Sequence, residues 1–340
     1  MTDTPNDLTT DDYPVAGLPD TPMWSENFAY SCNDPVSGVS MIVLLGRWWA
    51  DPTVWREVVA IALPGGRQIC IKNYGRAATD RVACGAMLRH EVLQPGRRLK
   101  ISYDGPAFDL DRTTLLRQGF IPAPPRRCRF EIVFDATTPV WDMSGHAGAT
   151  ADLTGALHIE QIGVGSGRIE FDGERWEIGN AFMNRDHSRG VRIFERYKRH
   201  CWAQGYFAED DIGFHVYAME FYGEDRLAMA NATVSQGGRR FPATLKDVEL
   251  IRGGADACQP YRIVIESELG TMALTKARTY GSIPISIMNP FDFHHGATPG
   301  VPSAMMFEEA AGWDWDGRQG LGWSERAFAS DPLYLYPPPR

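Results

Sequence analysis

The stretch NRDHSRG gathers the side chains of this sequence that are best suited to acid/base chemistry. It places Arg185, Asp186, His187, Ser188 and Arg189 in direct succession. An imidazole titrates near neutral pH, and a neighbouring carboxylate can fix the tautomer in which it accepts or donates a proton. Alternate side chains of a strand share a face, so the two arginines lie with His187, and Asp186 lies with Ser188.

Two interpretations of this cluster are open. In the first, His187 faces a pocket and moves a proton, while Asp186 turns away and holds the strand and a second domain in place. In the second, the cluster is a salt-bridged strand end that ties two domains together, a role that suits Arg185 and Asp186. We predict His187 and Asp186 as catalytic residues, and Arg185 and Arg189 as substrate-binding residues.

Two aromatic strands downstream, HCWAQGYF and GFHVYAMEF, are either pocket walls or half-buried structural strands. Tyr217 or His215 could protonate an alkene or take a proton from a phenol, and we predict Tyr217 as a third catalytic residue. Glu325, in GWSER, is either the partner of an arginine at the core rim or a pocket carboxylate. The further substrate-binding residues that we predict are Trp202, Tyr206, His215, Glu220 and Glu325.

The sequence predicts no cofactor and no metal. Asp292, His294 and His295 could bind a metal, but neighbouring histidines in a strand point apart, and a loop covering the pocket is the favoured interpretation. The six cysteines form no CxxC pair and no zinc spacing, which favours free thiols. The sequence contains neither a GxxxxGK[ST] loop nor a GxSxG motif, and no GxGxxG follows a strand.

Most of the chain reads as β-strands that must position these residues. Turn signals recur about every ten residues, which is typical of a sandwich or barrel. Hairpins are predicted at Pro64–Gly66 and Asp172–Gly173, and a turn at Asp104–Gly105. One short helix is predicted within Asp111–Phe120, with Asp111 as its N-cap.

The domain organisation follows from length and from one glycine-rich run. The chain has 340 residues, which suits two domains better than one. The run GVGSG, at 163–167, is not followed by a helix and is interpreted as a linker. We therefore predict a flexible acidic tail over 1–22, a first barrel over 23–165 and a second over 166–340.

Charge and composition narrow the partners. The net charge of −9 and a single short basic run, PPRRCRF, argue against nucleic-acid binding. The first 22 residues carry five Asp and no Lys or Arg, unlike a signal peptide, and no apolar stretch is long enough to span a membrane. We expect a cytoplasmic protein with a hydrophobic small-molecule substrate, and a homodimer is one expected state.

One long segment resembles a known group of proteins. GRIEFDGERWEIGNAFMNRDHSRGVR is similar to the hairpin and R-D-H-S/N-x-G motif of the carotenoid 1,2-hydratase (hydroxyneurosporene synthase) and AttH-like group. The opening PMWSENFAYSCNDPVSGVSMIVLLG and the closing DGRQGLGWSER also resemble that group, so the similarity runs from about Trp24 to Arg326. The group commonly has Trp where this chain has Arg189.

The resemblance implies two lipocalin-like β-barrels with a buried, largely apolar pocket and cofactor-free chemistry on a lipophilic substrate. The fold expected is therefore all-β, with two antiparallel barrels packed together and little helix. The function expected is a cofactor-independent lyase, hydratase or isomerase acting on a terpenoid, steroid or aromatic compound. The alternative is a non-catalytic carrier of such a ligand, since fold alone does not fix function. An enzyme needs at least two ionisable groups that converge on the ligand, whereas a carrier needs few. A structural partner protein would instead expose a large apolar patch.

Overall fold

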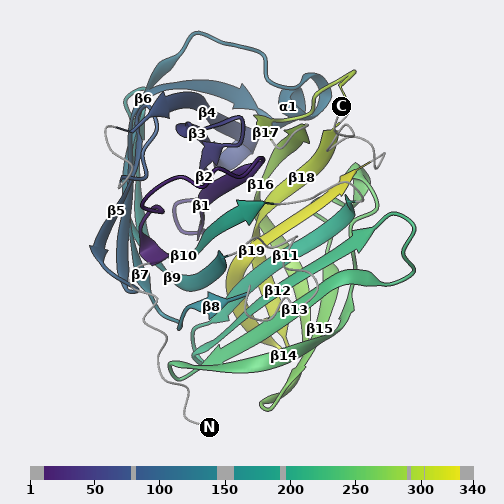
Figure 1. Cartoon of the computed structure of the whole chain (residues 1–340). Coiled ribbons are helices and arrows are strands. Elements are labelled where there is room, and N and C mark those ends of the chain that lie inside the picture. The colour runs from purple at the N-terminus through teal and green to yellow at the C-terminus, as the bar shows by residue number, and fades with distance from the viewer. Residues whose placement is uncertain are drawn as a thin grey trace.

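Two antiparallel β-barrels packed against each other make up nearly all of the structure (Figure 1). The computed structural model describes residues 11–77, 82–143, 157–191, 197–288, 292–301 and 303–329. Strand accounts for 71% and helix for 5%, which confirms the predicted fold class.

The strands divide cleanly between two sheets. The first sheet contains β1 (Trp24–Asp34), β2 (Val39–Trp48), β3 (Asp51–Ala62), β4 (Arg67–Arg76), β5 (Leu88–Gln94), β6 (Arg98–Asp111), β7 (Arg126–Ala136), β8 (Trp141–Asp142), β9 (Leu157–Phe171) and β10 (Glu174–Val191). The second contains β11 (Tyr197–Phe207), β12 (Ile212–Phe221), β13 (Leu227–Gln236), β14 (Arg239–Val248), β15 (Tyr261–Ser267), β16 (Gly270–Met288), β17 (Asp292–His295), β18 (Ser303–Trp315) and β19 (Arg318–Ala329). Helical elements of the described residues include α1 (Arg112–Gln118) and 3-10 turns at Pro64–Gly66 and Gly254–Asp256.

Both sheets close into rings of eight strands that follow chain order. The first ring runs β1-β2-β3-β4-β6-β7-β9-β10 and closes by the pairing of β10 with β1. Off this path, β5 pairs with β6 and β8 pairs with β9. The second runs β11 to β16, then β18 and β19, and closes by the pairing of β19 with β11, with β17 attached to β16. Up-and-down connections of this kind are lipocalin-like. Among the described residues, no helix is long and apolar enough to cross a bilayer.

Local sequence explains most of the turns. Asp172 and Gly173 both have positive φ, at 51° and 86°, which is the conformation of a tight hairpin turn between β9 and β10. The predicted helix is α1, and the Asp111 carboxylate caps it by accepting a hydrogen bond from the Thr114 amide at 2.8 Å.

Two predicted breaks lie inside strands instead. Gly105 is part of the continuous strand β6, where a Cβ would collide with the Met87 sulfur, so this glycine permits close packing rather than a turn. The GVGSG run lies within β9. The first sheet consequently extends to Val191, and the chain enters the second sheet at Tyr197, later than the predicted boundary.

Each barrel has an interior core, and a third core lies between the barrels. The interiors are filled by aromatic and branched side chains, including Trp55, Phe130 and Phe134 in the first barrel and Phe207, Phe214 and Trp313 in the second. The core between the barrels includes Ile42, Val58, Trp141, Met219, Ile285 and Trp323. Strands at this junction are therefore buried on both faces, and burying one such side chain contributes about 1.5–3 kcal/mol.

The inner part of the predicted tail is docked rather than loose. Residues 11–16, which we call the strap, lie across the first barrel, and Asp12 is fully buried. The Asp12 carboxylate accepts a hydrogen bond from Arg185 Nη1 at 2.6 Å, and the Asp11 carboxylate accepts one from Arg189 Nη2 at 2.8 Å. The aspartates that made this segment look like a loose acidic tail are the counter-charges of Arg185, which is buried, and Arg189, which is half-buried.

Candidate active site

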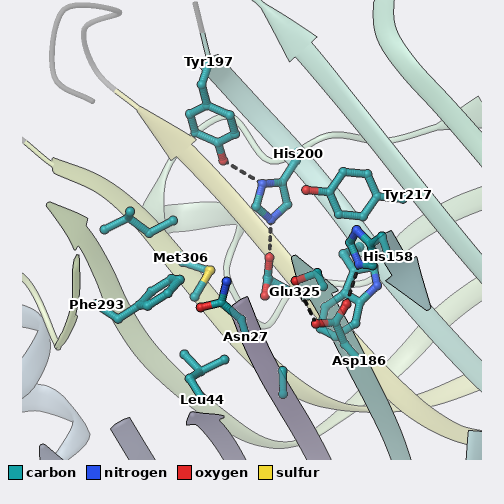
Figure 2. A pocket seen from close by; sticks show the side chains of 14 residues that line it. Asn27, Leu44, His158, Asp186, Tyr197, His200, Tyr217, Phe293, Met306 and Glu325 are labelled. Atoms are coloured by element: carbon teal, nitrogen blue, oxygen red, sulfur yellow. Dashed lines mark hydrogen bonds and ion pairs between the residues drawn. The ribbon is translucent and has the colours of Figure 1, made fainter. Parts of the chain in front are cut away.

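A pocket lies between the two barrels, where their outer surfaces meet (Figure 2). It has a volume of about 80 Å³, which is room for a few water molecules or for one small group of a larger ligand. The first barrel lines it with Asn27, Ala29, Leu44, His158, Asp186 and Ser188. The second barrel lines it with Tyr197, His200, Trp202, Tyr217, Ile287, Phe293, Met306 and Glu325.

Strand β10 serves two environments through its alternating faces. Asp186 and Ser188 point outward from the first barrel and line the pocket. His187 points into the first barrel, as do the flanking Arg185 and Arg189, which reach the strap. The side chains alternate as expected, but the assignment of the two faces was reversed: Asp186 faces the pocket, and His187 turns away from it.

The surroundings of His187 account for this placement. Its Nε2 lies 3.0 Å from Glu26 Oε1, its Nδ1 lies 2.5 Å from the Asp11 carbonyl oxygen, and its ring stacks on Phe28 at 3.9 Å. Glu26 also accepts a hydrogen bond from Arg47 at 3.0 Å. His187 is 1% exposed, so this polar cluster is internal to the first barrel and sealed by the strap.

The first ionisable pair of the pocket joins Asp186 to His158. His158, on β9, contacts the Asp186 carboxylate through Nε2, and Ser188 lies beside Asp186 on the same face of β10. Behind the pair, Glu160 Oε1 lies 3.6 Å from His158 Nε2 and accepts a hydrogen bond from Trp202 Nε1 at 2.7 Å. Burial, followed by the charge of Asp186, raises the pKa of Glu160 well above its ordinary value.

The second ionisable pair joins Glu325 to His200. His200 Nε2 contacts the Glu325 carboxylate, and His200 Nδ1 lies 3.0 Å from the hydroxyl of Tyr197. Burial raises the pKa of Tyr197 well above its ordinary value, so this phenol stays protonated and can donate to Nδ1. The tautomer of His200 that results carries its proton on Nε2, toward Glu325.

Tyr217 lies between the two pairs (Figure 2). Its ring stacks on His200 with a centroid separation of 5.7 Å and meets His158 edge-on at 6.2 Å. Two imidazoles, each fixed by a carboxylate, therefore flank one phenol in a pocket whose other walls are mostly apolar. Such a set can donate one proton and accept another within one bound molecule.

The same region has the donor types of a cation site. Ligand atoms of His158, Glu160 and Asp186 lie within 4.8 Å of one another, and all three residues are buried. Glu160 Oε2 and His158 Nδ1 have no hydrogen-bond partner among the described residues. The cluster at Asp292 is different, because Arg56 and Lys72 surround that carboxylate with positive charge.

The structure brings four of the predicted site residues to this pocket and places the others elsewhere. Those that line the pocket are Asp186, Tyr217, Trp202 and Glu325. Those outside it are His187, Arg185, Arg189, Tyr206, His215 and Glu220.

The surroundings of the last three explain their positions. Tyr206 donates to Asp211 at 2.6 Å at the end of its strand, and Glu220 is ion-paired with Lys198 and Arg199. His215 is buried behind the pocket, 3.1 Å from the Asn184 side-chain oxygen.

Sequence reasoning missed His158 and the pairing of His200 with Glu325. His158 and Glu160 are two ionisable residues at a spacing of two in LHIEQ, which puts them on one face of a strand, and this spacing is a signal that could have found them. His200 shares a face of HCWAQGYF with Trp202, as alternation predicts, but its carboxylate partner lies 125 residues away. Of His294 and His295, neither lines the pocket, whereas Phe293 beside them does.

Comparison with known proteins identifies a family and a fold. The Domain of unknown function (DUF7064) matches residues 9–329, and the chain therefore belongs to this family. No curated protein matches the sequence.

Three solved structures are similar over nearly their whole length. They are CghA with Sch210972 (TM-score 0.55, 11% identity, covering 97% of this chain and 96% of that one), an AttH-like protein from Nitrosomonas europaea (TM-score 0.53, 13% identity, 94% and 99%) and kievitone hydratase from Nectria haematococca (TM-score 0.47, 13% identity, 94% and 94%). The likeness to the first two establishes a shared fold and supports the AttH-like part of the resemblance.

Proposed function

We propose that this DUF7064-family protein is a cofactor-independent enzyme that acts by acid/base catalysis on a double bond of a hydrophobic small molecule. It either adds water to the double bond or forms the double bond by removing water, or it moves the double bond within the molecule. One observation carries the proposal: the carboxylate–imidazole pairs Asp186–His158 and Glu325–His200 face the same largely apolar pocket. A carrier of lipophilic ligands has no need of two such pairs, and burying them costs free energy.

The two pairs supply complementary halves of one reaction. For hydration, one pair gives a proton to a carbon of the double bond, and the other takes a proton from the water that attacks the neighbouring carbon. The sum adds one water molecule to the substrate, and the reverse sequence eliminates it. If a substrate C–H replaces water as the proton source, the same groups move the double bond. Positioned proton transfer of this kind contributes about 10²–10⁴-fold to rate.

The pocket walls fit an uncharged, apolar substrate. Leu44, Ile287, Phe293 and Met306 form an apolar end, with Trp202 beside the Asp186 pair. Excluding water strengthens the electrostatic interactions between the ionisable pairs and any developing charge. The small volume favours entry of the reacting end of a terpenoid, steroid or aromatic molecule. Tyr217, between the pairs, is placed to donate a hydrogen bond to an oxygen at the reacting carbon.

Exchange with heavy water tests the proposal before any substrate has been identified. Wild-type protein is incubated with a library of lipophilic alkenes and their hydrated forms in D₂O, and the masses of the products are measured by mass spectrometry. We expect at least one compound to gain deuterium or the elements of water, and we expect Asp186→Asn and Glu325→Gln to reduce this gain by about 10²-fold or more.

The matched control is Glu220→Gln, which neutralises a carboxylate outside the pocket and should leave turnover unchanged. Compounds that bind the wild type without any change of mass would identify a carrier and contradict the proposal.

A further inference from the structure

A buried glutamate, Glu308, lies directly behind Glu325, which lines the pocket. Glu308 on β18 and Glu325 on β19 are cross-strand partners in the antiparallel ladder. Such partners hold their Cβ atoms about 4.5–5.5 Å apart, and like charges placed there destabilise a sheet. Glu308 is fully buried, and the Glu325 side chain is 13% exposed, toward the pocket. Two carboxylates on such neighbouring positions in a dry environment disfavour each other's ionisation.

The two oxygens of Glu308 have different surroundings. Its Oε2 accepts a hydrogen bond from Trp323 Nε1 at 2.6 Å. Its Oε1 is buried and receives no hydrogen bond from any described donor, which suits an O–H that donates instead. Glu325 is the cross-strand neighbour of Glu308 and in turn contacts His200.

The charges that act on Glu308 come from two neighbouring strands. Burial, followed by the charge of Glu325 on β19, raises the pKa of Glu308 well above its ordinary value. The Trp323 indole and His200 on β11 favour its ionisation by smaller amounts. The adjacent Glu309 points into the second barrel, where Lys276 and Arg326 pair with it, so those cations serve the opposite face of β18.

We propose that Glu308 and Glu325 share one proton at neutral pH, and that this is the proton which the pocket delivers to the substrate. The second half of the statement rests on the proposed function. It assigns the acid to the Glu325 side and the base to Asp186 with His158. The proton passes from Glu308 to Glu325 and from Glu325 to a substrate carbon, where the π electrons form the new C–H bond. Water attacks the neighbouring carbon as Asp186 with His158 takes its proton, and solvent then restores the proton of the glutamate pair. Glu308 does not line the pocket and is therefore a positioning residue.

Infrared spectroscopy of the full-length protein tests the shared proton without any substrate. A protonated carboxyl group has a C=O stretch that is resolved from ionised carboxylates. We expect protonated C=O absorption at pH 7 in the wild type from the glutamate pair and from Glu160, whose pKa burial raises, and we expect Glu308→Gln to remove only the component of the pair. Glu220→Gln is the matched control, because the ion pairs of Glu220 outweigh its partial burial and lower its pKa, which leaves no protonated band to lose. If Glu308→Gln does not fold, Trp323→Phe removes the indole donor and should shift the band to higher frequency.

The pH dependence of turnover distinguishes positioning from a structural role. In the wild type, kcat falls at high pH as the pair loses its last proton. In Glu308→Gln the neighbouring charge is absent, so Glu325 loses its proton more readily and this limb moves to lower pH. A merely structural role would lower kcat equally at every pH and would overturn the assignment. If no band is sensitive to Glu308→Gln or Trp323→Phe, the shared proton is refuted, with or without turnover. If the band is present and no compound is turned over, the shared proton stands and the proposed function fails.

Discussion

The two faces of β10 predict opposite consequences for neighbouring substitutions. His187→Ala should destabilise the protein and leave the chemistry of the pocket intact, because His187 lies inside the first barrel. Asp186→Asn should leave stability nearly unchanged and lower turnover by about 10²-fold or more, because Asp186 lines the pocket. Adjacent residues in one strand thus separate a structural role from a catalytic one.

The magnitudes follow from the contacts. His187→Ala removes a ring stacked on Phe28 and takes from Glu26 a partner at 3.0 Å. Truncating a large buried side chain costs about 3–5 kcal/mol, and a buried carboxylate that loses a partner costs a similar amount. We expect about 4 kcal/mol and, at about 2–4 °C per kcal/mol, a melting temperature lower by about 10 °C.

Asp186→Asn keeps the shape of the side chain and an oxygen that can accept a hydrogen bond from His158. It also removes a negative charge that disfavours the ionisation of Glu160. The free energy of unfolding should therefore change by no more than about 1 kcal/mol.

Urea unfolding followed by tryptophan fluorescence measures both variants, and deuterium incorporation measures turnover on the same preparations. The reasoning is refuted if His187→Ala keeps its stability but loses turnover while Asp186→Asn unfolds early.

Three further predictions concern the strap, acid stability and metals. Asp12→Asn leaves Arg185 buried without its counter-charge and should lower the free energy of unfolding in urea by about 3 kcal/mol. The control Asp20→Asn, at an exposed position, should lower it by less than about 0.5 kcal/mol. Equal effects of the two variants would contradict the docking of the strap. Burial lowers the pKa of His295 to about 4, below its unfolded value of 6.5, so its contribution to stability is complete above pH 6.5 and is lost as pH falls toward 4. Between about pH 6 and 5, the free energy of unfolding of His295→Gln should therefore fall by about 1.4 kcal/mol per pH unit less than that of the wild type. Parallel curves of stability against pH would contradict this assignment. Turnover should survive exhaustive chelation, and its loss with recovery on adding a divalent metal would make the cluster around Glu160 a ligand set.

Much of the fold was predictable because local sequence encodes it. Asp172–Gly173 can adopt the positive φ values of a tight hairpin, and Asp111 can cap a helix, whatever the rest of the chain does. The breaks predicted at Gly105 and in GVGSG were wrong because a glycine also allows close packing inside a strand. At Gly105 the neighbour is Met87, which lies just before β5 and is not visible in the local pattern.

The site was predictable in part, for a reason that β10 makes plain. Alternation separates Asp186 from His187, but it does not say which face meets the pocket, because both faces are buried. The pocket side is decided by the packing of the second barrel, and the other side by the strap. His158 and Asp186 lie on the consecutive strands β9 and β10, but a bulge between Ile178 and Ala181 shifts their register and is not visible in the spacing. Glu325 could not be paired with His200 because 125 residues separate them in the sequence.

The central claim is that the pocket between the barrels binds the substrate with both ionisable pairs around its reacting carbon. The most direct test is a crystal structure of the folded but inactive Asp186→Asn variant soaked with a compound that the wild type converts in D₂O. We predict density between the barrels, with the reacting carbon beside Tyr217 and within reach of His158 and Glu325. Density for the compound inside either barrel, or against a surface that neither pair can reach, would contradict the account.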